Sequence, residues 1–137
     1  MQHNELADLA RYRISRAKET LAAAERELRA EDFRSANNRA YYAVFHAIRA
    51  LLALDGADYK KHSGVLAHFN QYYIKTGVFP IEFSTIVGNA SIIRNGSDYD
   101  DFYICSKEQT IRLVESVSIV IAAIERYLVA EADCGDV

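Results

Sequence analysis

The sequence is poor in the residues that make turns and crosslinks. Its 137 residues include 1 Pro, 6 Gly, 2 Cys and no Trp. So few turn-forming residues argue against an all-β protein, which needs many tight turns. The two cysteines, Cys105 and Cys134, are too few for a disulfide scaffold or a cysteine-based zinc site. We therefore expect both thiols to be reduced.

Long apolar segments are also missing. The longest uninterrupted apolar run covers residues 119–124, whereas a membrane-spanning helix needs about 20 apolar residues. The first residues, MQHNELADLARYR, lack the apolar core of a signal peptide. We therefore expect a cytoplasmic protein without membrane contact.

The composition that remains fits a folded globular domain. Half of the residues are hydrophobic, at 50%, and the formal net charge is −3. The length predicts one domain over residues 1–137, with an ordered core over about residues 5–131. A net negative charge excludes a protein that binds nucleic acid simply through an overall basic surface. Lys and Arg outnumber Asp and Glu only in residues 1–54, so we expect any anion site to use that half.

Apolar residues at helical spacing predict five helices. A possible N-cap precedes the second helix at Asp32 and the third at Ser63, and Gly56 is suited to end the second. Four long helices joined by short connections predict an all-α, up-and-down antiparallel four-helix bundle with one short extra helix. The predicted helices cover about residues 6–28, 33–54, 64–75, 82–95 and 106–132.

Arg94 breaks the pattern of the fourth predicted helix. On a helical wheel it falls in the middle of the apolar stripe that contains Phe83, Val87 and Ala90. A guanidinium in that position needs a partner, because an unpaired buried charge is costly. One interpretation is an ion pair with Asp98, one turn further on. The other is an arginine that faces a cleft and binds phosphate through its planar fork of donors.

The segment after Arg94 is acidic. It carries Asp98, Asp100 and Asp101, with aromatic residues between and after them. The spacing does not fit a calcium-binding loop, so we interpret it as a solvated turn. We expect no metal and no cofactor.

Two further sets of polar residues suit an anion. A row on helix 33–54 has spacings of three, four and three, and comprises Arg39, Tyr42, His46 and Arg49. It is either an ordinary solvent face or the wall of a cleft, in which His46 could exchange protons near neutral pH. The second set precedes the third helix and comprises Lys60, Lys61 and His62. It is either a solvated loop or an anion site at a helix N-terminus.

Four stretches of the chain together resemble the small stand-alone HEPN-domain proteins. They are RAYYAVFHAIRALL from Arg39, KKHSGV from Lys60, YIKTGVFP from Tyr73 and RNGSDYDDFY from Arg94. The resemblance covers roughly residues 5–130. It implies a helical bundle that forms homodimers, and metal-independent cleavage of RNA in the dimer cleft. It also implies a toxin–antitoxin role, with a minimal nucleotidyltransferase as the antitoxin partner.

The family motif is an arginine, often followed by a polar residue, then a histidine after four to six intervening residues. Here Arg94 and Asn95 match its start, but Tyr99, Asp100 and Asp101 occupy the places of the histidine, so the chain resembles a subgroup that lacks it. The resemblance implies that Arg94 binds the phosphate and that a histidine transfers protons. In this chain that histidine would have to be His46 or His62. The candidate catalytic residues are Arg94, Asn95, Tyr99 and His46; the candidate phosphate- or RNA-binding residues are Arg39, Arg49, Lys60, Lys61 and His62.

Two functions follow from the sequence. The first is a HEPN component of a toxin–antitoxin system with ribonuclease activity. The alternative is a non-catalytic module that binds RNA, a nucleotide or a partner nucleotidyltransferase. In paired HEPN systems the partner can adenylylate a tyrosine near the motif, and the candidates here are Tyr99 and Tyr103.

Overall fold

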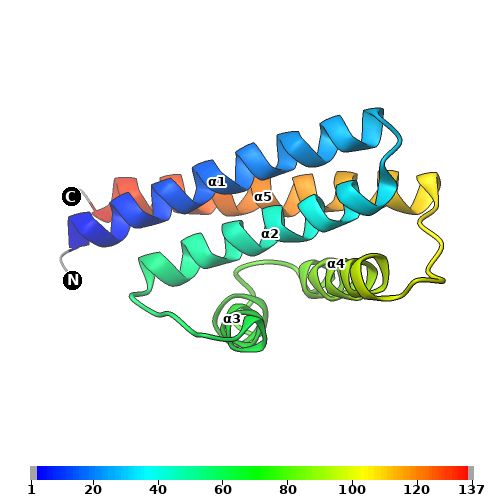
Figure 1. Cartoon of the computed structure of the whole chain (residues 1–137). Helices are drawn as coiled ribbons and strands as arrows, with labels where there is room; N and C mark the ends of the chain where they lie inside the picture. The colour runs from blue at the N-terminus through cyan, green and yellow to red at the C-terminus, as the bar shows by residue number, and fades with distance from the viewer. Residues whose placement is uncertain (1–2, 136–137) are drawn as a thin grey trace.

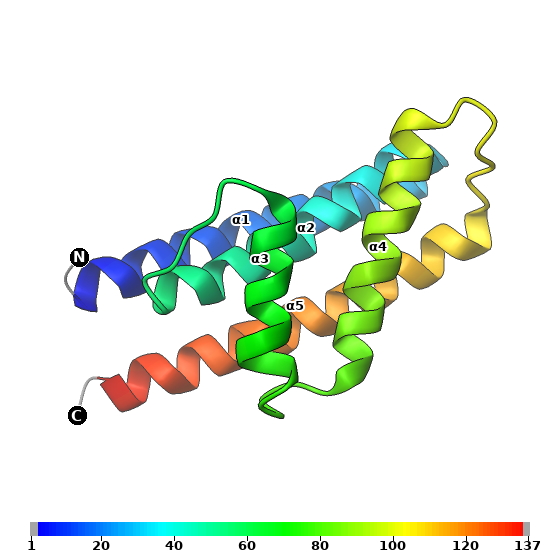
Figure 2. The same ribbon diagram turned by 90° about the horizontal axis from the view of Figure 1, so that it is seen from below.

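Three long helices lie side by side along the length of the molecule in the computed structural model, which describes residues 3–135 and the side chains of residues 5–131. They are α1 (His3–Arg29), α2 (Phe33–Leu54) and α5 (Lys107–Gly135), and α1 runs opposite to the other two. Helix α4 (Ile81–Tyr99) crosses α2 and α5, as Figure 1 and Figure 2 show. The short helix α3 (His62–Phe69) and a π-helical turn, η1 (Asn70–Ile74), precede α4. The predicted all-α bundle with an extra short helix is confirmed.

Helix α2 is the centre of the bundle and contacts α1, α3, α4 and α5. One reason is its content of small side chains, which let neighbouring helices approach closely. Five alanines of α2 have no exposed surface: Ala36, Ala40, Ala43, Ala47 and Ala50. Asp32 caps the helix by accepting a hydrogen bond from the Ser35 backbone N–H at 3.2 Å. The chain then turns at Gly56, where φ is +69°, so the predicted limits of α2 are confirmed.

A partly buried polar network anchors α3 and η1 to the end of α2. The Asp55 carboxylate lies 2.9 Å from His68 Nε2 and accepts a hydrogen bond from the Tyr73 hydroxyl at 2.8 Å. His68 Nδ1 in turn lies 3.1 Å from the Tyr59 hydroxyl. Burial, followed by the contact with Asp55, raises the pKa of Tyr73 far above its usual range, so the phenol keeps its proton.

The start of α3 differs from the prediction. The helix begins at His62, its N-cap residue is Lys61, and no side chain caps it. The predicted cap at Ser63 is therefore wrong. The consequence for the site is that His62 is held in the first helical turn instead of in a free loop.

Helix α4 continues to Tyr99, so its predicted end at Asn95 is also wrong. Contacts with α2 hold the extra turn in place. The buried Ser97 hydroxyl accepts a hydrogen bond from Asn37 at 3.1 Å, and Arg34 donates to the Ser97 carbonyl. These tertiary contacts outweigh the poor helix propensity of the Asn-Gly-Ser sequence.

No helix in the described part of the chain is long and apolar enough to span a membrane. Cys105 is a free thiol that lies 3.3 Å from the Ser97 hydroxyl. The side chain of Cys134 lies outside the described residues.

Candidate functional site

The guanidinium of Arg94 lies against α2, and its side chain is only 15% exposed. Its Nη2 donates to the Tyr42 hydroxyl at 2.6 Å, and its Nη1 donates to the Asn95 side-chain oxygen at 3.1 Å. Its Nε lies 3.1 Å from Asp98 Oδ2, an ion-pair distance, although the N–H is not aligned for a hydrogen bond. The ion pair that the sequence spacing suggested is therefore present.

Three tyrosine rings surround the same guanidinium. The Cζ atom of Arg94 lies 5.4 Å from the ring centroid of Tyr41, 5.2 Å from that of Tyr42 and 5.4 Å from that of Tyr99. These are distances at which a cation is attracted to an aromatic face. Each terminal nitrogen of an arginine carries two N–H groups, and the described residues provide each of them with one acceptor. The second N–H on each nitrogen has no hydrogen-bond acceptor among the described residues.

His62 joins this cluster from the first turn of α3. Its Nδ1 lies 3.0 Å from the Tyr41 hydroxyl, and its ring centroid lies 4.2 Å from that of Phe45 and 6.0 Å from that of Tyr42. Tyr41 and Tyr42 therefore both contact Arg94 and His62. The arginine of α4 and the histidine of α3 meet on one pair of neighbouring α2 residues.

The surroundings favour the neutral form of His62. Burial lowers the pKa of His62, and the positive charges of Arg94 and Arg49 lower it further. Burial raises the pKa of Tyr41, so that residue remains a phenol. A neutral imidazole has one ring nitrogen that can accept a proton.

His46 lies beside α1 among arginines, in a different environment from His62. Burial lowers the pKa of His46, followed by the charges of Arg16, Arg49, Arg39 and Arg13. The structure therefore does not bring His46 into the cluster around Arg94.

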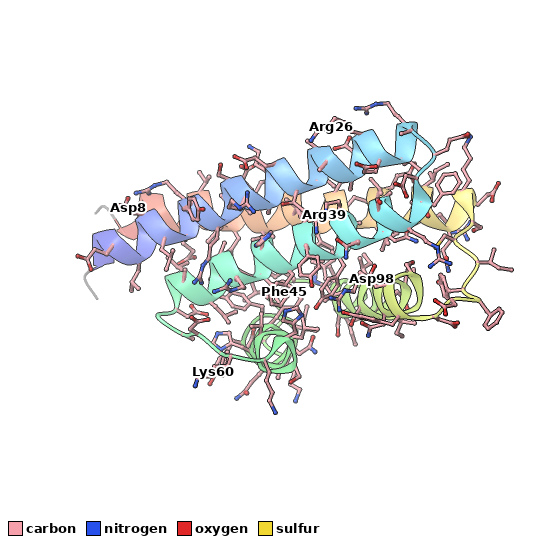
Figure 3. All side chains as sticks on the ribbon, viewed as in Figure 1. Asp8, Arg26, Arg39, Phe45, Lys60 and Asp98 are labelled. Atoms are coloured by element: carbon pink, nitrogen blue, oxygen red, sulfur yellow. The ribbon has the colours of Figure 1, made fainter. Side chains whose placement is uncertain are left out.

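Arg39 and Arg49 connect the two environments. The Arg39 guanidinium donates to the Asn38 side-chain oxygen and has its Cζ 5.5 Å from the Tyr42 ring centroid. Arg49 lowers the pKa of both His46 and His62. Figure 3 shows Arg39 on the α1–α2 side of the site, with Asp98 on α4.

The remaining candidates lie at the margins of the cluster. Lys60 and the exposed Lys61 immediately precede α3, and Lys60 lines a pocket together with His62. Tyr99 is 73% exposed, whereas the Tyr103 hydroxyl donates to Gln109 and its ring packs against Gly96. Tyr99 is thus the accessible tyrosine of the two.

Sequence reasoning missed Tyr41 and Asn38. The helical pattern placed Tyr41 on the apolar side of α2, although its hydroxyl contacts His62. Asn38 donates to Asp98 Oδ2 at 2.8 Å and so helps to hold the partner of Arg94. Neither role leaves a periodic signal in the sequence, because each depends on a residue from another helix.

The acidic turn does not form a metal site within the described residues. Asp98 pairs with Arg94, and the Asp100 carboxylate accepts a hydrogen bond from the Phe102 backbone N–H at 3.0 Å. These carboxylates serve local structure and oppose the positive charge of Arg94.

The fold and the site describe a small helical-bundle protein with an arginine held between two helices, and comparison with known proteins agrees. The family model of the HEPN domain matches residues 10–127. The chain is 34% identical to a UPF0332 protein of Thermotoga maritima, over 91% of this chain and 95% of that protein. It is also 31% identical to a protein of Methanocaldococcus jannaschii named "Putative toxin MJ0142", over 86% of this chain and 80% of that protein. This chain therefore belongs to the HEPN domain family, as its sequence predicted.

The electrostatic difference between the two histidines can be tested by titration. We expect Arg94→Gln to raise the pKa of His62, because removal of a neighbouring positive charge favours the imidazolium. The same variant leaves the pKa of His46 unchanged, since the charges that act on His46 come from other arginines. We expect Arg16→Gln to raise the pKa of His46 and to leave that of His62 unchanged. NMR titration of the imidazole signals measures both values, and equal shifts of both histidines would contradict this assignment.

Proposed function

We propose that this protein is the HEPN component of a toxin–antitoxin-type system and a metal-independent endoribonuclease. The observation that carries the proposal is the meeting of Arg94 and His62 on Tyr41 and Tyr42. A permanently charged guanidinium can hold the phosphate of RNA, and a neutral imidazole can accept a proton, so the pair can act without a metal. The printed name of the Methanocaldococcus jannaschii relative supports the toxin role.

In the proposed reaction, the ribose 2′-hydroxyl attacks the adjacent phosphorus and its proton passes to His62 Nε2. This requires the tautomer in which Nδ1–H donates to the Tyr41 hydroxyl. Arg94 stabilises the negative charge that develops on the phosphate oxygens. The P–O bond to the 5′-oxygen breaks, that oxygen takes a proton from water, and a 2′,3′-cyclic phosphate remains. The hydroxide left by that water takes the proton from His62, which returns the imidazole to its neutral form. Asn95 contributes by accepting a hydrogen bond from Arg94 and so fixing its fork.

One observation favours a second function, a non-catalytic module that binds RNA, a nucleotide or a nucleotidyltransferase. Asp98 lies 3.1 Å from Arg94 Nε, where its carboxylate competes with a phosphate for the guanidinium. The residues at the places of the motif histidine, Tyr99, Asp100 and Asp101, are also poor proton acceptors or repel phosphate. The two functions differ in whether bound RNA is cleaved.

Cleavage of single-stranded RNA by purified protein separates these functions. We expect Arg94→Ala to reduce the cleavage rate by about 100–1,000-fold, as the loss of a group that stabilises transition-state charge does. We expect His62→Ala to reduce it by about 100–10,000-fold, the range of general acid–base catalysis. A chelator should leave the rate unchanged. The measurement is the rate of product formation on a denaturing gel.

Two further variants make the result specific. Arg126→Ala removes an exposed arginine of α5 and serves as the matched control for Arg94→Ala. His46→Ala tests the other histidine, and its inactivity combined with an active His62→Ala would assign the proton transfer to His46. Wild-type protein that binds RNA and leaves it intact would establish the non-catalytic module instead.

We propose that α4 forms the interface of a homodimer. Its exposed face carries Ile81, Ile92 and Tyr99 beside the polar Thr85 and Asn89, and the only charged residues between 81 and 97 are Glu82 and Arg94. A groove of about 470 Å³ between α4 and α5 includes Ile92 in its lining. A helix face with three exposed apolar residues suits a second copy of the chain, and Tyr99, whose ring centroid lies 5.4 Å from Arg94 Cζ, would carry the contact to the margin of the Arg94 site.

Light scattering tests this interface. The wild-type protein is expected at twice the mass of the 15.4 kDa chain. Ile92→Lys buries a charge in the proposed interface and should yield the monomer. Ile119→Lys is the control, because Ile119 is 59% exposed on α5 and lies outside the α4 face. A monomeric wild type, or dissociation by Ile119→Lys alone, would exclude the α4 interface.

We propose that a partner nucleotidyltransferase silences the protein by adenylylating Tyr99. The resemblance to paired HEPN systems motivates this proposal, and the exposure of Tyr99 beside Arg94 supports it. A phosphate on the Tyr99 hydroxyl would place negative charge near Arg94 and exclude the phosphate of RNA.

The intact-protein mass after co-expression with a neighbouring nucleotidyltransferase gene tests this modification. We expect the addition of one or more AMP units, and the loss of at least one unit in Tyr99→Phe. Tyr103→Phe is the matched control and should retain the full addition, because the Tyr103 hydroxyl is engaged with Gln109. Full addition to Tyr99→Phe would place the modification elsewhere.

A further inference from the structure

A pocket of about 340 Å³ lies beside the Arg94–His62 cluster. It is formed by the middle of α2, the segment before α3 and the first residue of α3. Its volume falls in the range of sites that hold small ligands or parts of larger ones. Its lining consists of three aromatic and three charged residues: Phe45, Tyr59 and His62, and Arg49, Asp58 and Lys60.

The aromatic side of the pocket is pre-arranged. Phe45 and His62 pack with ring centroids 4.2 Å apart. The Tyr59 ring is 44% exposed, yet its hydroxyl is held 3.1 Å from His68 Nδ1, and His68 is fixed by Asp55. Gly64 permits the close packing of Tyr59, since a Cβ at Gly64 would lie 3.0 Å from the ring. A fixed and partly exposed aromatic face is suited to stack on a flat ligand.

The charged side of the pocket favours an anion. Arg49 forms only a loose pair with Asp58, at 3.6 Å. Among the described residues Lys60 has no ion-pair partner. The two cations outnumber the single carboxylate, so the pocket combines a stacking surface with a net positive charge. That is the combination of groups that binds the base and backbone of single-stranded nucleic acid.

The pocket adjoins the cluster around Arg94, because His62 belongs to both. We propose that the pocket binds the base of a nucleotide that flanks the phosphate held by Arg94. This inference rests on the proposed function and specifies its substrate. A base can enter such a pocket only when it is neither stacked on its neighbours nor paired with another strand. Duplex RNA is therefore excluded.

Binding of an uncleavable 2′-O-methyl single-stranded oligonucleotide that contains 2-aminopurine tests the pocket. Stacking on an aromatic ring quenches the fluorescence of 2-aminopurine. Tyr59→Leu is expected to abolish the quenching and to weaken binding by about tenfold, the loss typical of one stacked base. Tyr59→Phe is the matched control, because it keeps the ring and removes only the hydroxyl that contacts His68. It should retain both the affinity and the quenching.

The outcomes separate this inference from the proposed function. If Arg94→Ala weakens binding while Tyr59→Leu does not, the base pocket is wrong and the phosphate site stands. If duplex RNA binds as tightly as the single strand, the substrate assignment is wrong. If Tyr59→Leu weakens the binding of free AMP but not the binding of the oligonucleotide, the pocket holds a free nucleotide and the proposal fails. If the wild-type protein binds no RNA at all, the proposed function itself fails.

Discussion

The arrangement of the site depends on how the charge of Arg94 is held between two helices. An arginine side chain with only 15% exposure needs several partners, because a buried charge without partners is costly. Asn95 and Asp98 belong to α4 itself, whereas Tyr42 belongs to α2. The contact with Tyr42 therefore also fixes the position of α4 on α2.

Local signals predicted α2 well and the end of α4 poorly, for one physical reason. Helix α2 has a side-chain cap at Asp32 and a left-handed turn at Gly56, and both act within a few residues of the helix ends. The last turn of α4 is instead held by Asn37, which is 60 residues from Ser97. Helix propensity accounts for the local signals at the ends of α2. It does not account for the end of α4, because it contains no information on tertiary contacts.

In the candidate site, too, local contacts were predictable from the sequence and contacts between distant residues were not. Helical periodicity identified Arg94, and spacing of four residues identified its ion pair with Asp98. The contact between Tyr41 and His62 joins residues 21 apart and follows from the anchoring of α3, which no periodicity encodes. Sequence reasoning therefore found Arg94 and its ion pair, and left His46 and His62 as alternatives for the histidine of the site.

The position of His62 beside Arg94 links phosphate binding to proton transfer in the proposed ribonuclease. Burial, followed by the positive charges of Arg94 and Arg49, lowers the pKa of His62, which favours the neutral imidazole but also makes it a weaker base. A phosphate bound at Arg94 adds negative charge and offsets that effect. The imidazole thus becomes a stronger base when the substrate occupies the site. A histidine supplied by α3 can in this way replace one from the motif, provided that it shares the same arginine.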